Sequence, residues 1–183
     1  MTQGLRYKRT LRRAAGFTLL ELMVTVAVLA IVAGLAAPSF RNVIQSNRLV
    51  SSSNEMVAML QAARLAAVSN RITVTVCPTA DGSTCTASAG NHWIALGPGG
   101  AGVLREIRLH QSVAVTASPS LVTAGYRMVF GPNGFSRVGT GTGGSVGLCI
   151  AGLSGNNSAD VGVSAGRISS VRRQSATCSA PGG

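Results

Sequence analysis

The feature that most constrains this chain is an apolar run near its N-terminus that contains a single acid. The run extends from Phe17 to Ala37. A helix of that length, at about 1.5 Å per residue, spans roughly the 30 Å core of a bilayer. Glu21 lies near its beginning, and a carboxylate inside a bilayer costs about 2.5–3.5 kcal/mol on insertion scales. The run therefore predicts a membrane helix with a functional acid whose charge needs a partner.

The charge of the chain is uneven along its length. Its 16 basic and 5 acidic residues give a net charge of +11, and the segment before the apolar run contains bases and no acid. These bases are Arg6, Lys8, Arg9, Arg12 and Arg13. Such a segment stays in the cytoplasm, so everything after Pro38 is expected outside, where disulfides form. The four cysteines all lie on that exported side.

Without the first five bases, 11 arginines remain against the same 5 acids, or +6. A basic exported domain is typical of proteins with an anionic partner such as nucleic acid or a membrane surface, but general solubility explains it equally well.

Three interpretations compete for the N-terminus. A cleaved secretory signal would use Gly34-Leu35-Ala36 as a small-x-small site, but the run is long and contains an acid. A simple signal anchor leaves Glu21 unexplained. Cleavage between Gly16 and Phe17 would create a free amine four residues from Glu21, and that amine is the missing positive partner.

The segment from Gly16 to Glu21, GFTLLE, resembles the leader-peptidase site of type IV pilins and pseudopilins. The resemblance implies cleavage after Gly16 by a prepilin peptidase and N-methylation of Phe17. It also implies that Glu21 pairs with the amine of an adjacent subunit during assembly. Pro38 matches the proline that these families carry at the end of the membrane-embedded half of the helix.

The helix is expected to continue past Pro38 to about Asn70, because proline kinks a helix without necessarily ending it. An apolar stripe follows Val43, Val50 and Val57 at intervals of seven, joined by Phe40, Ile44, Leu60, Ala63 and Ala67. Arg41, Gln45, Arg48, Ser52 and Glu55 are assigned to the other faces. The stripe predicts an amphipathic helix buried by a sheet.

The remainder of the chain alternates β-branched stretches with turn residues, which predicts short antiparallel strands. The candidate strands are 71–77, 92–96, 104–109, 112–117, 127–130, 146–151, 160–163 and 167–171. Gly131–Gly134 predicts a hairpin turn, and 139–144 and 152–158 predict loops. The predicted fold class is α+β, one helix packed on antiparallel sheet.

This half resembles the H-type pseudopilins and the FimT-like minor pilins. The resemblance rests on VTVC with DG, C and W (Val74–Trp93), on FGPNG (Phe130–Gly134), and on Gly166-Arg167 before the terminal Cys178. It implies a pilin-like fold with four parts: a cleaved leader (1–16), a transmembrane half-helix (17–37), an amphipathic half-helix (38–70) and a periplasmic β domain (71–183).

The cysteines lack the close spacing of zinc sites, so disulfides are the simpler assignment. Four cysteines allow three connectivities, and proximity favours Cys77–Cys85. The family resemblance supports a second bridge, Cys149–Cys178, that ties down the C-terminal segment. No catalytic residue, metal or cofactor is expected, because no nucleophile motif surrounds any serine and neither His92 nor His110 lies in a catalytic pattern.

The segment Gly166–Arg173 holds Arg167, Arg172 and Arg173, and no acid occurs from Val161 to the end. Arginines bind phosphates through planar bidentate contacts, but a solvated basic edge that blunts strand pairing is the alternative. Alternation along a strand places Arg167 and Arg173 on one face and Arg172 on the other. FimT-like pilins bind DNA through Gly-Arg-x-Arg; here Ser169 replaces the second arginine. The resemblance implies that Arg167, Arg172 and Arg173 bind DNA.

The sequence thus predicts a FimT-like minor type IV pilin of the bacterial inner membrane that joins or initiates a pilus with other pilin subunits. It is expected to bind DNA without sequence preference for uptake in natural transformation. The alternative is a type II secretion pseudopilin of the H class that acts in protein secretion.

Overall fold

The structure, a computed structural model, describes residues 16–100 and 102–182. The described residues fall into two units, one ending at Phe40 and one beginning at Arg41. The predicted leader lies outside the described residues except for Gly16.

A single long helix, α1, runs from Leu19 to Asn70. It ends where Arg71 adopts a left-handed conformation, with φ of 55°. The amide of Ile72 then donates to the Ala67 carbonyl at 3.0 Å and that of Arg71 to the Val68 carbonyl at 3.4 Å. This is the Schellman pattern, which satisfies the last carbonyls of a helix. The predicted end of the helix at Asn70 is confirmed.

Among the described residues, no single helix is long and apolar enough to cross a membrane. The two segments Leu19–Leu35 and Ser39–Asn70, taken together across a bend, meet the length and composition of a span.

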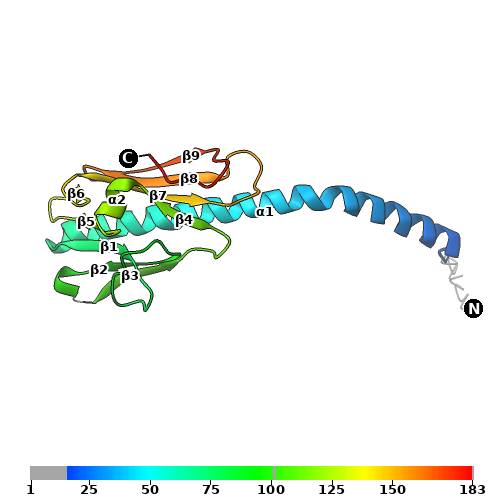
Figure 1. Cartoon of the computed structure of the whole chain (residues 1–183). Coiled ribbons are helices and arrows are strands. Elements are labelled where there is room, and N and C mark those ends of the chain that lie inside the picture. The colour runs from blue at the N-terminus through cyan, green and yellow to red at the C-terminus, as the bar shows by residue number, and fades with distance from the viewer. Residues whose placement is uncertain (1–15, 101, 183) are drawn as a thin grey trace, which may run out of the picture. The chain divides into compact units, whose positions relative to one another are not determined.

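After α1 the chain forms two antiparallel sheets (Figure 1). The first contains β1 (Val74–Pro78), β2 (His92–Leu96), β3 (Val103–Arg108), β5 (Met128–Phe130) and β6 (Ser136–Arg137), in the order β3-β2-β1-β5-β6. The second contains β4 (Ala114–Ala117), β7 (Gly143–Cys149), β8 (Ser158–Ser164) and β9 (Arg167–Arg173), in the order β4-β7-β8-β9. The α+β class and all eight predicted strands are confirmed, with ends that differ by a few residues.

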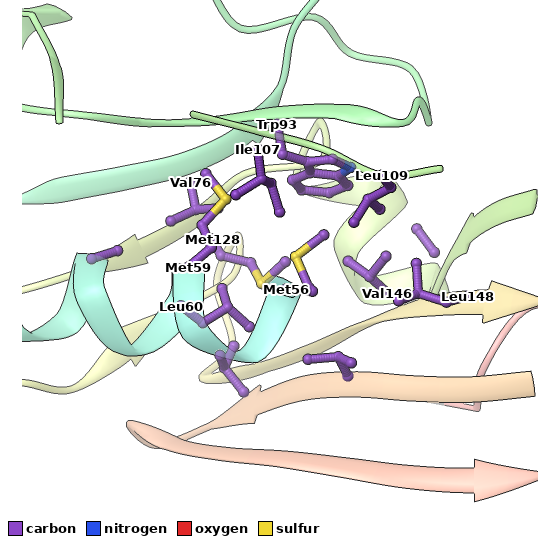
Figure 2. Packing of buried hydrophobic residues seen from close by; sticks show 14 of the residues in the cluster. Met56, Met59, Leu60, Val76, Trp93, Ile107, Leu109, Met128, Val146 and Leu148 are labelled. Carbon is purple, nitrogen blue, oxygen red and sulfur yellow. The ribbon is translucent and has the colours of Figure 1, made fainter. Parts of the chain in front are cut away.

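The main core lies between the two sheets and the last turns of α1. Met56, Met59 and Leu60 of α1 pack with Trp93 of the first sheet and Leu148 of the second, as Figure 2 shows. All of these side chains are fully buried. Helix α1 therefore packs against both sheets, which share no strand pair among the described residues.

The buried line on α1 differs from the predicted one. It runs through Leu49, Met56 and Ala63, also at intervals of seven but offset by one position from Val43, Val50 and Val57. Leu60, Ala63 and Ala67 are buried as predicted. The prediction was wrong for Phe40, Val43 and Ile44, whose side chains are exposed, and for Ser52, which is buried. On α1 the buried side chains begin only at Leu49, and Ser52 is small enough to fit under the sheets.

Three short elements were not predicted: helix α2 (Pro119–Thr123), the 3₁₀ turn η1 (Pro98–Gly100) and strand β6. The predicted loop at 139–144 was wrong at its end, because β7 begins at Gly143. Gly143 pairs with Ser164 of β8, so strand pairing overrides the weak strand propensity of the Gly-rich sequence.

The unit from Arg41 onward contains both sheets, both disulfides and every buried core residue. Its side-chain hydrogen bonds, from Ser51 to Arg173, connect residues within the same unit. Residues 41–183 therefore hold everything needed to fold as an independent domain.

Candidate functional site

The predicted processing segment lies at the beginning of α1. Gly16 and Phe17 precede the helix, and the Phe17 side chain is 78% exposed. Thr18 Oγ1 accepts a hydrogen bond from the Glu21 amide N–H at 3.2 Å, as the side chain of an N-cap residue does. Glu21 lies in the first helical turn, where the helix dipole favours a carboxylate. Thr18 and Glu21 have the spacing of a capping box, which was not among the features predicted from the sequence.

The structure contains both disulfides that were predicted. Cys77 pairs with Cys85 across a loop that begins at the end of β1, and Cys149 pairs with Cys178. In the first loop the backbone N–H groups of Thr84 and Ser83 hold the pKa of Asp81 far below its ordinary value. Asp81 therefore acts as the hydrogen-bond acceptor that orders this loop.

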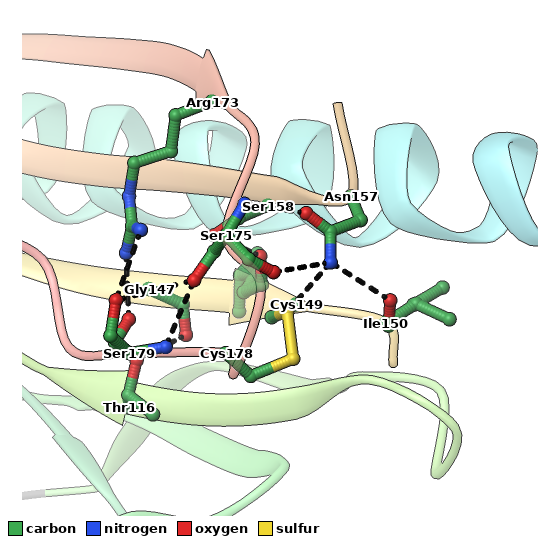
Figure 3. Close-up of a disulfide and its surroundings, with 11 residues drawn as sticks. Thr116, Gly147, Cys149, Ile150, Asn157, Ser158, Arg173, Ser175, Cys178 and Ser179 are labelled. Atoms are coloured by element: carbon green, nitrogen blue, oxygen red, sulfur yellow. Dashed lines mark hydrogen bonds between the residues drawn. A yellow bond between two sulfur atoms is a disulfide. The ribbon is translucent and has the colours of Figure 1, made fainter. Parts of the chain in front are cut away.

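Cys178 anchors a C-terminal tail whose hydrogen bonds Figure 3 shows. Buried Asn157 accepts the Ser175 amide N–H and donates to the Ser175 carbonyl, both at 2.8 Å. Asn157 Nδ2 also lies 3.5 Å from the Ile150 carbonyl oxygen. The tail is thus fixed by one covalent bond and by the side chain of Asn157.

The three predicted arginines lie on β9, the edge strand of the second sheet. Arg167 begins the strand, and Arg172 and Arg173 end it. At about 3.3 Å per residue, five residues separate the Cα atoms of Arg167 and Arg172 by roughly 17 Å. The arginines therefore form two separate groups.

Arg173 is engaged within the domain. Its Nε lies 2.6 Å from Asp160 Oδ2, and its Nη2 donates to the Ser179 carbonyl at 2.7 Å. The side chains of Arg173 and Asp160 are 27% and 18% exposed. The pair links β9, β8 and the C-terminal tail. Arg172 is exposed, and among the described residues its side chain donates to the Asn156 carbonyl alone, at 3.1 Å.

Arg167 borders an open groove of about 680 Å³, which we call the Arg64–Arg167 groove. Its lining residues are Gln61, Arg64, Leu65 and Val68 from α1, and Ala165, Gly166, Arg167 and Ile168 around the β8–β9 turn. Neither Arg64 nor Arg167 takes part in any of the three ion pairs among the described residues. The groove therefore presents two free guanidinium groups and no carboxylate.

Arg64 was not among the residues predicted from the sequence. The available signal was the absence of any acid between Glu55 and Asp81. Because a helix places its residues all around its axis, that signal does not say which basic residue of the segment meets the β8–β9 turn.

A glycine contact holds the groove in shape. Gly166 has φ of +87°, and a Cβ there would lie 2.4 Å from the Gly134 carbonyl oxygen. Ser136 Oγ accepts the Gly166 N–H at 2.8 Å and donates to the Thr142 carbonyl at 2.8 Å. A Cβ on Gly134 would in turn lie 3.3 Å from Arg64 Nε. The FGPNG and Gly-Arg segments, distant in sequence, are therefore in direct contact beside Arg64.

The histidines form local pairs. His92 Nε2 lies 2.6 Å from Glu106 Oε1, and Arg108 contacts the same oxygen at 3.1 Å. These two contacts, that of His92 first, hold the pKa of Glu106 below its ordinary value. His110 Nδ1 lies 2.7 Å from Ser112 Oγ. Within residues 16–100 and 102–182, no three His, Cys, Asp or Glu side chains are grouped to hold a metal ion.

Two family models match the sequence. The one described as type II transport protein GspH matches residues 52–167, and the one described as the prokaryotic N-terminal methylation motif matches residues 11–37. No curated protein matches the chain.

Among solved structures, the fold is similar to the type IV minor pilin FimU of Pseudomonas aeruginosa in two crystal forms. One has a TM-score of 0.52 at 23% identity and covers 72% of this chain and 96% of FimU. The other has a TM-score of 0.50 at 23% identity, with 70% and 99% covered. Both crystal forms contain the same pilin, so the second match adds no further protein to the comparison.

Proposed function

The chain belongs to the family of type II transport protein GspH, and from this premise we propose that it is a minor type IV pilin that binds DNA without sequence preference. In this proposal a prepilin peptidase cleaves between Gly16 and Phe17, and Phe17 is N-methylated. The segment 17–37 anchors the chain in the bacterial inner membrane, and the domain after it lies in the periplasm until it joins a pilus.

Assembly in this proposal uses Glu21. The methylation motif matches residues 11–37, which include the cleavage site and Glu21. An amine on Phe17 of one subunit would neutralise the Glu21 carboxylate of its neighbour, which removes the cost of an unpaired charge in the bilayer.

The observation that carries DNA binding is the pair of free arginines in the Arg64–Arg167 groove. Two guanidinium groups without carboxylate partners suit phosphate oxygens, which arginine binds in bidentate fashion. Arg172, exposed at the other end of β9, supplies a further phosphate contact. We assign Arg173 to the Asp160 pair and therefore to stability rather than to DNA contact.

A salt titration of the domain 41–183 on duplex DNA tests this proposal. Each phosphate neutralised contributes about −0.9 to the log–log slope of affinity against salt, so contacts by Arg64, Arg167 and Arg172 predict a slope near −3. Replacing each of the three by alanine is expected to weaken binding and flatten the slope by about one unit. Arg48→Ala, on the exposed part of α1 outside the groove, is the matched control and is expected to leave the slope unchanged.

Coincident curves for the wild type and the triple variant would leave the groove without a role in DNA binding. The description of the matched family favours a second candidate, a type II secretion pseudopilin of the H class. Deleting the gene separates the two: loss of pili and of DNA uptake supports the minor pilin, and loss of exoprotein secretion supports the pseudopilin.

A further inference from the structure

Phe135 is an exposed aromatic residue that the proposed duplex contact does not use. It lies between β5 and β6 and is 58% exposed, whereas nearby Phe130 is fully buried. It follows Gly134, and its Cα would lie 3.3 Å from a Cβ on Gly166. Phe135 therefore stands directly beside the Arg64–Arg167 groove.

Phe135 also lines a second hollow of about 340 Å³, which we call the Phe135 hollow. Its lining residues are Thr73, Val129, Gly131, Pro132, Asn133, Phe135, Ser136 and Arg137. A third hollow, lined in part by Arg127, shares Val129 and Arg137 with it. The two hollows are thus adjacent along β5 and β6.

These hollows are basic and contain no acid. Arg137 and Arg127 are exposed, and neither belongs to an ion pair among the described residues. Arg64 and Arg167 of the groove, with Arg137 and Arg127 of the two hollows, make a surface in which cations lie around an exposed aromatic ring. This is the combination that proteins use for unpaired nucleic acid, with phosphates on the cations and a base stacked on the ring.

We propose that a single-stranded polynucleotide crosses this surface with one base stacked on Phe135 and its phosphates bound by Arg64 and Arg167 of the groove and by Arg137 and Arg127 of the two hollows. The inference rests on the proposed function and specifies its ligand as a strand with unpaired bases. In a duplex the base faces are already stacked on one another, so none is available to stack on Phe135. Hydrogen bonds to base edges are not required, because every base has a π-face.

The test compares two oligonucleotides of about 16 nucleotides, the upper end of common single-strand site sizes. One is oligothymidylate, and the other is an abasic strand with the same phosphates. The domain 41–183 is expected to bind oligothymidylate more tightly. Phe135→Ala is expected to lower affinity for oligothymidylate about 5- to 150-fold, the range for loss of one stacked base, and to leave the abasic strand unaffected.

Three further variants isolate the ring. Phe135→Trp retains the π-face and is expected to retain the preference for bases, whereas Phe135→Leu retains apolar volume and is expected to lose it. Leu104→Ala on β3 truncates an equally accessible apolar side chain, 47% exposed, that lines neither hollow, and is expected to have no effect. Cross-linking with a 5-iodouracil oligonucleotide, mapped by mass spectrometry, is expected to label Phe135.

The outcomes separate the two proposals. If the wild type binds both strands equally and Phe135→Ala changes neither affinity, the stacking site is refuted while phosphate binding stands. If the wild type binds neither the strands nor duplex DNA at low salt, the proposed DNA function fails and the stacking site fails with it. A thermal melt of each variant shows whether its fold is intact, and Phe135→Leu decides the result if Phe135→Ala is unstable.

Discussion

Gly166 combines a left-handed backbone with direct contact to the neighbouring hairpin. Its φ of +87° is unfavourable for any side chain, and the Gly134 carbonyl oxygen occupies the space that a Cβ would need. Gly152, with φ of +79°, has nothing within 4 Å of the same position. A side chain at Gly152 would therefore meet only the cost of the left-handed backbone, whereas one at Gly166 would also meet the cost of displacing the Gly134 carbonyl.

Gly166→Ala is expected to destabilise the domain by more than the roughly 1–3 kcal/mol of a strained backbone, because the hairpin must also move. Gly152→Ala is expected to show the backbone cost alone. Urea unfolding of both variants measures the difference. Equal free energies of unfolding would mean that the Gly134–Gly166 contact relaxes without cost. DNA affinity is expected to fall only for Gly166→Ala, because only this glycine shapes the Arg64–Arg167 groove.

Two adjacent arginines on β9 are expected to have opposite roles. Arg173→Ala leaves the mostly buried Asp160 carboxylate without its cation and is expected to cost about 1–3 kcal/mol of stability with little change in DNA affinity. Arg172→Ala removes one exposed bond to the Asn156 carbonyl, so stability is expected to change by less than about 0.5 kcal/mol while DNA affinity falls. Chemical unfolding and a DNA titration of the two variants measure stability and affinity separately. If Arg173→Ala lowers DNA affinity and Arg172→Ala does not, the DNA contact is made by Arg173 instead.

Among the elements, β9 depends most on its surroundings. Within the part of the chain that the structure describes, it pairs with β8 alone, so its other edge makes no strand pair. Ser170 on this strand shares a hydrogen bond of 2.9 Å with Ser53 of α1. The tail that follows is held by Asn157 and by Cys178. The edge strand that presents Arg167 and Arg172 is thus fixed from α1 and from the tail.

The two disulfides are expected to differ in their contribution to stability. In the chain-entropy account, Cys77–Cys85 contributes about 2.6 kcal/mol and Cys149–Cys178, which closes a longer loop, about 3.6 kcal/mol. Paired Cys→Ser variants measured by urea unfolding test this order. Loss of the second disulfide is also expected to loosen the tail and weaken the Arg173–Asp160 pair, so Ser175 amide exchange is expected to increase. If the first pair proves more stabilising, loop closure does not dominate.

At the scale of the whole molecule, charge and hydropathy change along the chain. The acid-free basic segment before Gly16 precedes an apolar run, and the arginines of the groove and hollows come from the domain after Arg41. The one acid of the apolar run lies in the first helical turn, five residues after the proposed cut. Processing would therefore place a new positive charge close to the only negative charge of that run.

Mass spectrometry of the membrane fraction is expected to find a chain that begins at methylated Phe17. Glu21→Ala is expected to insert into the membrane, since it removes a costly charge, but to enter filaments poorly because the amine of the neighbouring subunit loses its partner. Immunoblots of sheared filaments measure incorporation, with Glu55→Ala, an exposed acid in the domain, as the control. An intact N-terminus, or one near Ala37, would contradict the processing.

The sequence by itself determined the class of fold and most of its elements. The end of α1 at Asn70, eight of the nine strands in the described residues and the pair Cys77–Cys85 follow from local patterns of hydropathy and turn residues, and the structure agrees with each. Local composition also identified Arg167 as one of three arginines in a C-terminal stretch without acids. These features depend on residues near one another in the chain, which is why they are readable from it.

Only the tertiary structure decided which residues of α1 are buried and which arginines are free. The shift from Val50 and Val57 to Leu49 and Met56 depends on how the sheets lie against the helix, and one position of helix is about 100° of rotation. The Arg64–Arg167 groove, the Arg173–Asp160 pair and the exposed Phe135 all depend on contacts between segments distant in sequence. Identical arginines acquire different roles because packing, which no local pattern encodes, supplies a carboxylate to one and open solvent to the others.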